Sequence, residues 1–284
     1  MFDQRTIKSP VKFSGIGLHS GKVANVRIVP AEENSGIVIK RIDIAENNEI
    51  AAIYSNVTEV LYSTKLSNEH GVFVNTIEHL MAAIFAMKIS NLIIEMDAEE
   101  MPIMDGSSQG FIFLIECVGI KKQKSARKFA KILNKIEIEK SEYRKVSVEP
   151  NDSFAVNFVV KNDSMPLING EYFFDATFQS FINDISLART YCNFQEIEKL
   201  KSMNLAQGGS LQNAIVVNNN EVLNEGGLNY ANEFARHKIL DLIGDVALSE
   251  YYIIGKFDAV NSGHELNNVL MRKIFENPEN YEIL

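Results

Sequence analysis

The sequence has few cysteines, no excess of basic charge and no long hydrophobic run, and each of these absences excludes a class of protein. The two cysteines, Cys117 and Cys192, lie far apart, so we expect neither a disulfide-stabilised scaffold nor a cysteine-based zinc site. The formal net charge of -9 argues against general nucleic-acid binding, which normally uses a basic surface. No apolar stretch is long enough to cross a bilayer and no terminal segment resembles a secretory signal, so we expect a cytoplasmic protein without stable membrane insertion.

The length of the chain and one polar segment suggest how it divides. A chain of 284 residues suits two domains or one large domain. The short basic segment 121–128 lies between two apolar regions, and we interpret it as a solvated linker in preference to a phosphate site. We therefore expect an N-terminal α+β domain at residues 1–124 and a C-terminal α+β domain at residues 125–284.

Hydrophobic periodicity indicates that both halves mix strands and helices. The strands are joined mostly by tight turns and cluster apart from the helices, which favours the α+β class over a parallel doubly wound sheet. Cys117 lies in an apolar run, and we expect it to be a core thiol. Alternating patterns predict strands at 23–29, 37–42, 92–96, 131–139, 145–148 and 154–160, and helical patterns lie near Thr76, Gln195, Asn232 and Glu265.

The segment 234–245 combines an apolar helical pattern with His237, Asp241 and Asp245, spaced four residues apart. Side chains at positions i and i+4 share one helix face, so His237 and Asp241 could bind one metal ion, which we predict to be zinc. Asp245, one turn further on, could hold either a ligand or a neighbouring catalytic group. A His/Asp pair often only stabilises an exposed helix, and the pattern by itself leaves that alternative open.

A second helix start supplies another histidine and an acidic neighbour. His79 is predicted to face away from the apolar stripe of its helix, which makes it available as a third ligand. Glu78 has two interpretations. Asn75 and Glu78 have the spacing of a capping box, but a carboxylate beside a metal-binding histidine could also take a proton from water.

Two glycine-containing segments are interpreted as loops. The glycines at 15–17 do not form a dinucleotide-binding loop, because the following segment 23–29 alternates like a strand where a Rossmann fingerprint requires a helix. We predict a hairpin turn there. The segment 207–210 is predicted to be a flexible loop, with anion binding by its backbone N–H groups as the alternative.

These residues belong to an ordered series of motifs that extends over nearly the whole chain. Any one motif could arise by chance, but the ordered set is highly specific. The motifs lie at residues 15–21, 76–80, 102–107, 188–190, 207–214, 236–241 and 262–267. The series resembles that of the zinc-dependent UDP-3-O-acyl-N-acetylglucosamine deacetylases of lipid A biosynthesis.

The resemblance implies a fold and a metal site. The fold would consist of two similarly built sheet-and-helix layers with the active site between them. A zinc ion would be held by His79, His237 and Asp241, with a fourth position left for water. Glu78 would take a proton from that water as it attacks the acetamide carbonyl.

The resemblance also implies roles for three further side chains. The Thr190 hydroxyl would meet the oxyanion that forms during attack. His264 would be held as a cation by Asp245 and would protonate the departing glucosamine nitrogen. A mechanism in which Glu78 serves as both base and acid stays open.

Substrate contacts are expected from residues near these motifs. Lys238 and Arg144 are predicted to contact sugar or phosphate oxygens, and His19 to lie in a loop beside the substrate. Tyr191 begins a Tyr-Cys-Asn segment where many family members carry a Phe-rich stretch beside the acyl chain. Asn261 stands where many members carry a basic residue, so one phosphate contact of the family is absent or supplied elsewhere, for instance by Arg144.

The sequence thus predicts a monomeric zinc hydrolase that releases acetate from UDP-3-O-acyl-N-acetylglucosamine and has no nucleic-acid partner. One alternative is a zinc amidase for another small amide, although the absence of a His-Glu-x-x-His motif argues against a peptidase. Another is a nucleotide-sugar or lipid-binding module without turnover. The presence of Glu78, Asp245 and His264, beyond the metal ligands, disfavours that module.

Overall fold

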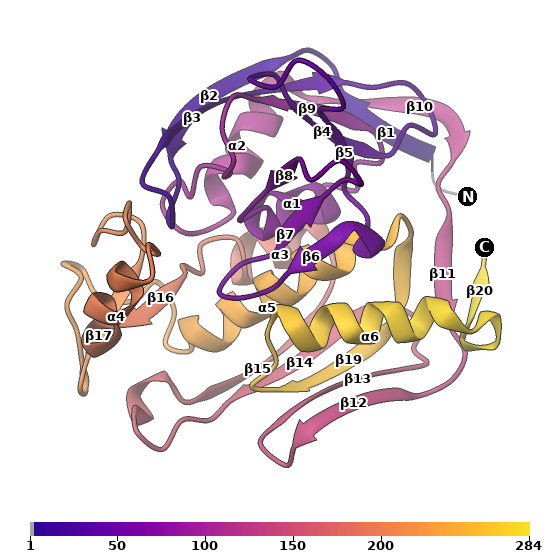
Figure 1. Cartoon of the computed structure of the whole chain (residues 1–284). Coiled ribbons are helices and arrows are strands. Elements are labelled where there is room, and N and C mark those ends of the chain that lie inside the picture. The colour runs from indigo at the N-terminus through magenta and orange to yellow at the C-terminus, as the bar shows by residue number, and fades with distance from the viewer. Residues whose placement is uncertain (1–2) are drawn as a thin grey trace.

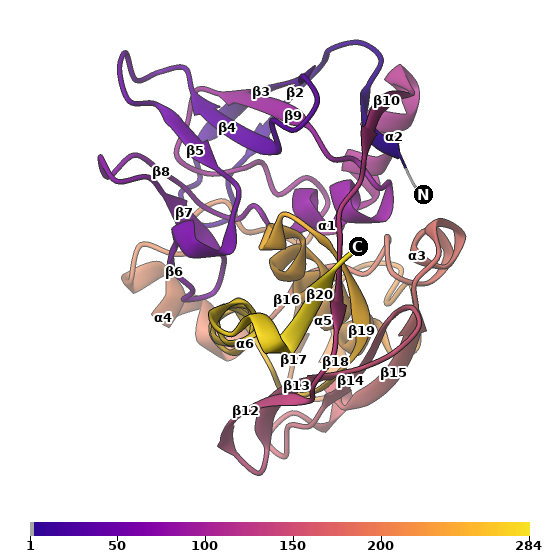
Figure 2. The same cartoon turned by 90° about the vertical axis from the view of Figure 1, so that its right-hand side faces the viewer.

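The computed structural model describes residues 3–284, which form two sheet-containing layers with helices packed between them (Figures 1 and 2). In the N-terminal layer, the five-stranded sheet has the order β2-β3-β9-β4-β5. Its strands are β2 (Val11–Ile16), β3 (Val23–Pro30), β4 (Ile37–Arg41), β5 (Glu49–Ala51) and β9 (Leu92–Met96), and its helices are α1 (Glu78–Ala86) and α2 (Gln109–Val118).

The C-terminal layer is built on a seven-stranded mixed sheet in which β19 is the central strand, paired with β11, β13 and β14. Alternate residues of β19 are buried, as expected for a strand with one face on a core. The strands are β11 (Phe129–Ile132), β12 (Ile136–Ser141), β13 (Arg144–Glu149), β14 (Phe154–Val160), β15 (Gly170–Asp175), β19 (Tyr252–Val260) and β20 (Tyr281–Ile283), with α5 (Glu233–Val246) and α6 (His264–Glu276).

Helices α1 and α5 pack against each other between the layers, and this contact positions the candidate site. Every residue of α1 is buried, so its two polar residues, Glu78 and His79, are carried into the interior. A Cβ atom at Gly244 of α5 would lie 2.2 Å from the backbone oxygen of Glu78. Glycine is therefore required at position 244 for the start of α1 to approach α5 this closely.

Smaller elements surround these layers. Two three-stranded sheets have the orders β6-β7-β8 and β16-β17-β18. Their strands are β6 (Val57–Glu59), β7 (Lys65–Ser67), β8 (Phe73–Val74), β16 (Tyr191–Asn193), β17 (Ile215–Asn218) and β18 (Glu221–Val222). The remaining helices are α3 (Phe178–Asp184), α4 (Ile197–Ser202), and the short η1 (Tyr54–Asn56), η2 (Pro166–Ile168), η3 (Phe194–Glu196), η4 (Ala247–Ser249) and η5 (Pro278–Asn280).

The basic segment 121–128 connects the two layers and has mostly exposed side chains, but it is a regular strand over most of its length. Most of it forms β10 (Ile120–Ala126), which pairs antiparallel with β1 (Asp3–Ile7) and leads from one layer to the other (Figure 1). The strand was not predicted from the sequence because its polar side chains show no apolar alternation. A two-stranded ribbon on the surface buries little of either face. Arg127, at the end of this segment, is buried. The division into domains at 1–124 and 125–284 stays a prediction.

The predicted α+β class is confirmed, and most of the predicted strands are present. The predicted strand at 131–139 is in fact two strands, β11 and β12. The hairpin after Gly15 is confirmed, since the Gly17 N–H donates to the Lys22 carbonyl. Cys117 is exposed, which contradicts the prediction of a core thiol. Within residues 3–284, no helix has the length and apolar character needed to span a membrane.

Candidate active site

A cleft of about 780 Å³ opens between the two layers, and side chains from both halves of the chain line it. Asp245 lies behind this lining, in contact with His264. The other residues singled out from the sequence all line the cleft: His19, Glu78, His79, Arg144, Thr190, Tyr191, His237, Lys238, Asp241 and His264.

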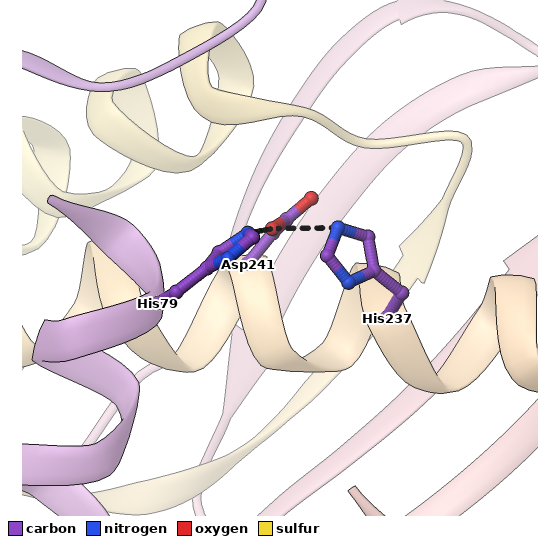
Figure 3. A group of neighbouring side chains, drawn as sticks. All are labelled: His79, His237 and Asp241. Atoms are coloured by element: carbon purple, nitrogen blue, oxygen red, sulfur yellow. Dashed lines mark ion pairs between the residues drawn. The ribbon is translucent and has the colours of Figure 1, made fainter. Parts of the chain in front are cut away.

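His79, His237 and Asp241 form one buried cluster at the contact between α1 and α5 (Figure 3). The Nε2 atoms of His237 and His79 lie 3.4 Å and 3.6 Å from Oδ1 of Asp241. Ligand bonds of about 2.0–2.2 Å in a tetrahedral zinc site place neighbouring donor atoms ~3.3–3.6 Å apart. The spacing of these donors, and their chemical types, therefore fit a zinc ion.

A hydrogen bond and burial leave the Nε2 atom of His237 available to bind a metal. Its Nδ1 lies 3.0 Å from the carbonyl oxygen of Ala188, so Nδ1 carries the proton and donates it, leaving the Nε2 lone pair free. Burial lowers the pKa of His237 to about 3, which keeps the ring neutral. The loop that presents Ala188 is anchored by Arg189, whose Nε donates to the fully buried Glu233 at 2.9 Å.

Asp241 is held in its charged form. Burial by itself would raise the pKa of its carboxyl group, but electrostatic interactions with His237 and Lys238 outweigh burial and lower that pKa well below its ordinary value. The Lys238 ammonium donates to Oδ2 of Asp241 at 2.8 Å. Oδ1, which faces both histidines, is thus left to bind a cation.

Glu78 does not form the capping box that its spacing allowed. Helix α1 begins at Glu78 itself, and the residue before it, Ile77, makes no side-chain cap. The Glu78 carboxyl is 3% exposed, and its Oε2 accepts a hydrogen bond from the Thr64 N–H. Burial raises its pKa, while the nearby His264 and His79 act in the opposite direction. A buried carboxyl with a raised pKa is suited to accept a proton near neutral pH.

His264, the first residue of α6, faces Glu78 across the cleft. Its Nδ1 lies 2.9 Å from Oδ2 of Asp245, and its Nε2 lies 3.8 Å from Oε1 of Glu78. Burial lowers the pKa of His264, but the charge of Asp245 and its hydrogen bond raise it more, to about 10. The ring is therefore a cation at neutral pH, with an N–H directed toward Glu78.

Two side chains that the sequence analysis missed hold Asp245 in place. The Thr64 hydroxyl donates to Oδ1 of Asp245 at 2.6 Å, and the Asn267 amide donates to Oδ2 at 2.8 Å. Thr64 therefore contacts both Asp245 and, through its backbone, Glu78. No local pattern marks Thr64, whereas Asn267 ends the motif at 262–267 and could have been included with it.

The loop that carries His19 is fixed from two sides. Both carboxylate oxygens of the buried Glu100 accept backbone N–H groups, from His19 and Ser20. The N–H groups of Gln207 and Gly208 donate to carbonyls of the same loop. These two donors are therefore unavailable to an anion, and the segment 207–210 is a close-packed loop rather than an anion-binding one.

The candidate substrate-binding residues differ in whether their polar groups already have partners within the protein. His19 lies in the cleft, and no other described residue hydrogen-bonds to its buried Nε2 atom. Tyr191 lies beside Lys238, whose ammonium is 5.5 Å from the centre of its ring. Arg144, on the rim, pairs with Glu265 at 3.3 Å. Thr190 lines the cleft, and its backbone N–H donates to the carbonyl of Gly106.

Asn261 has a structural role in place of a basic side chain. It adopts a φ of 46°, and its amide group bonds the backbones of Lys161 and Tyr143. The side chain thus fastens the loop before α6, and contributes no charge to the rim of the cleft.

The geometry of the cleft defines a class of protein. A buried group of three candidate metal ligands, with a proton-accepting carboxyl on one side and a cationic histidine on another, is the arrangement of a hydrolase that activates water. Residues 4–276 match the family model described as LpxC, UDP-3-O-acyl N-acetylglycosamine deacetylase, and the chain belongs to that family.

Curated relatives support the assignment to this family over nearly the full length of the chain. Three of those named UDP-3-O-acyl-N-acetylglucosamine deacetylase come from Shewanella halifaxensis, Marinobacter nauticus and Aliarcobacter butzleri. They are 41%, 40% and 40% identical to this chain. The alignments cover 100%, 100% and 99% of this chain and 93%, 93% and 92% of the relatives.

Proposed function

We propose that this protein hydrolyses the N-acetyl group of UDP-3-O-acyl-N-acetylglucosamine, releasing acetate and the free amine, as a step of lipid A biosynthesis. The observation that carries the proposal is the convergence of His79, His237 and Asp241 with Glu78 and His264 in one cleft. Family membership and the names of the relatives supply the substrate. We further propose that the protein acts as a monomer in the cytoplasm.

Zinc is the metal that we propose for the cluster of two histidines and one aspartate. A zinc ion there would lower the pKa of a water molecule and polarise the acetamide carbonyl. The neutral state of His237 and the charged state of Asp241 are the states in which these side chains bind metals. Lys238 keeps one oxygen of Asp241 engaged and so limits how that carboxylate can turn.

Glu78 and His264 divide the proton transfers between them. Glu78 accepts a proton from the attacking water, and its raised pKa favours retention of that proton while the tetrahedral intermediate exists. The His264 cation donates a proton from Nε2 to the departing nitrogen, and Asp245 keeps its ring oriented and charged. The Thr190 hydroxyl donates a hydrogen bond to the oxyanion. The single-residue alternative, with Glu78 serving as both base and acid, predicts a different pH dependence.

The cleft extends beyond the reacting groups and offers room for the remainder of the substrate. Its volume of about 780 Å³ is within the range of ligand pockets. We propose that Lys238 and His19 contact the sugar, that Arg144 contacts a phosphate at the rim, and that the acyl chain runs along Tyr191. Binding at the rim requires Arg144 to exchange its exposed ion pair with Glu265, which costs little.

Acetate release is the direct test of the proposed function. Purified protein incubated with UDP-3-O-acyl-N-acetylglucosamine is expected to release acetate, to lose this activity after treatment with a chelator, and to regain it on addition of zinc. A protein that binds the substrate without releasing acetate would support the non-catalytic module instead. Turnover that persists after complete removal of metal would contradict the metal-dependent mechanism.

The roles of Asp245 and His264 predict a shift in pH dependence. His264 loses its positive charge as the pH rises through its pKa, so activity should fall on the alkaline side of the pH profile. Asp245→Asn removes the negative charge that raises this pKa, and we expect the alkaline limb of kcat/KM to move down by about 1–3 pH units. Metal content should not change, because neither residue is a proposed ligand.

The comparison needs kcat/KM profiles of the wild type, Asp245→Asn and His264→Ala. An alkaline limb that stays in place in Asp245→Asn, or persists unaltered in His264→Ala, would remove His264 from the acid role and favour the alternative in which Glu78 acts as both base and acid.

A further inference from the structure

Thr64 lies just beyond a segment that lines the catalytic cleft. Residues 58–62 line the cleft, and Thr64 follows two residues later, directly before β7. Leu61 and Tyr62 are exposed, whereas Ser63 and Thr64 are buried. The sheet β6-β7-β8 lies beside α6 in both views of the molecule (Figures 1 and 2). The chain therefore carries Thr64 from the rim of the cleft into the contact between the two layers.

Thr64 uses all of its polar groups in hydrogen bonds. Its hydroxyl donates to Oδ1 of Asp245 at 2.6 Å, and its N–H donates to Oε2 of Glu78 at 3.2 Å. Its carbonyl oxygen accepts the N–H of Thr76 at 3.1 Å. Thr64 thereby joins α5 of the C-terminal layer to the start of α1 in the N-terminal layer.

The Thr64 hydroxyl fills a place at Asp245 that no other group fills. Oδ2 of Asp245 already faces Nδ1 of His264 at 2.9 Å and accepts from the Asn267 amide at 2.8 Å. In the part of the chain that the structure describes, no second donor bonds to Oδ1. Asp245 is 4% exposed, and a buried carboxylate oxygen without a donor is unfavourable. Without the hydroxyl, we expect the carboxylate to turn, and the His264 ring to turn with it.

We propose that Thr64 is a positioning residue that sets His264 against Glu78 across the cleft. This inference rests on the proposed function, in which these two side chains transfer the protons. They come from different layers, with Nε2 of His264 lying 3.8 Å from Oε1 of Glu78. The N–H of Thr64 fixes the Glu78 carboxyl, and its hydroxyl fixes the carboxylate of Asp245, which orients the His264 ring.

The effect of Thr64 on turnover is indirect. Thr64 does not line the cleft, so it acts on the reaction only through the two carboxyl groups that it bonds. Proton transfer requires donor and acceptor within hydrogen-bond reach of the reacting atoms, and small errors in their placement slow the reaction. A change at Thr64 should therefore alter kcat more than KM.

Thr64→Val removes the hydroxyl, keeps the branched shape of the side chain and keeps the N–H that bonds Glu78. In the metal-loaded protein we expect kcat to fall by ~10–100-fold with little change in KM, since a misplacement of about 1 Å can have an effect of this size. Metal content should not change. Thr64→Ser, which keeps the hydroxyl, should retain most of the turnover. Acetate release at varied substrate concentration gives kcat and KM, and elemental analysis gives the metal content.

A second comparison tests whether Thr64 acts through His264. In the His264→Ala background, Thr64→Val should lower kcat little further, because residues that act as a unit have non-additive effects. Equal fold losses in both backgrounds would overturn the proposal. Thr6→Val is the matched control, because Thr6 on β1 is also buried and its hydroxyl accepts the Ala31 N–H at 3.1 Å, outside the cleft. It should keep the wild-type kcat, whatever its effect on the melting temperature.

The outcomes separate this inference from the proposed function. A wild type that releases no acetate would overturn the proposed function, on which the role of Thr64 depends. An active wild type with an equally active Thr64→Val would overturn the role of Thr64 alone. So would a Thr64→Val variant that loses metal in proportion to turnover, which is the result expected of a purely structural residue. If Thr64→Val does not fold, Thr64→Ala and Thr64→Ser carry the comparison, since these two variants differ only by the hydroxyl.

Discussion

Replacement of His237 or Asp241 by alanine is expected to remove the metal and abolish deacetylase activity. His79 comes from α1 and the other two proposed ligands from α5, so a single truncation leaves two of the three proposed ligands. Two ligands hold zinc far less tightly, and without the ion water lacks its main activator. Elemental analysis of the purified variants gives metal per chain, and acetate release gives activity.

His70→Ala is the control for the loss of a histidine, because His70 is exposed and outside the cleft. It should retain full metal and full turnover. Full zinc occupancy in both His237→Ala and Asp241→Ala would show that the ligand set is wrong, whatever their activity. In Asp241→Ala the partly buried ammonium of Lys238 also loses its partner, so this variant should melt at a lower temperature than His237→Ala.

Removal of the Glu78 carboxylate is expected to lower turnover by roughly 10²–10⁴-fold, the usual contribution of general acid–base catalysis. Glu78→Gln is the sharper variant, because it preserves the volume of the side chain and an oxygen that can accept the Thr64 N–H. Glu78→Ala tests the same role with a larger change. Metal content should match the wild type in both.

Stability separates catalysis from any structural role of Glu78. Burial raises the pKa of Glu78 in the folded state, so its ionisation above the unfolded pKa costs stability instead of supplying it. Glu78→Gln should therefore melt no lower than the wild type at neutral pH. A variant that melts much earlier while turnover survives would assign Glu78 to structure. Glu276→Gln, at an exposed carboxylate outside the cleft, controls for the charge change.

Hydrophobic periodicity was sufficient to predict the strands with strong apolar alternation, such as β9 and β14, and the four-residue steps of α5 located His237, Asp241 and Asp245. Predictions from the local spacing of residues were wrong where burial in the tertiary structure determined the contacts of a side chain. Asn75 and Glu78 fit a capping box, but the packing of α1 against α5 draws Glu78 into the interior, where Thr64 binds it.

Thr64 and Arg127 show why the remainder could not be predicted. Thr64 is a short polar residue before β7, and its importance arises only because Asp245, distant in sequence, folds against it. Arg127 lies near the end of a segment whose basic composition is typical of a solvated linker, yet the residue is buried after β10 pairs with β1. The composition of a segment gives its charges, but it does not predict which of the charged side chains are buried in the fold.

The close contact of Gly244 with the start of α1 also bears on when the proposed metal site can form during synthesis. The backbone of Glu78 rests against Gly244, so His79 meets His237 and Asp241 only after α5 has left the ribosome and docked on α1. A nascent chain that ends before α5 contains one of the three proposed ligands. The proposed metal site can therefore form only after α5 has been synthesised and has docked on α1.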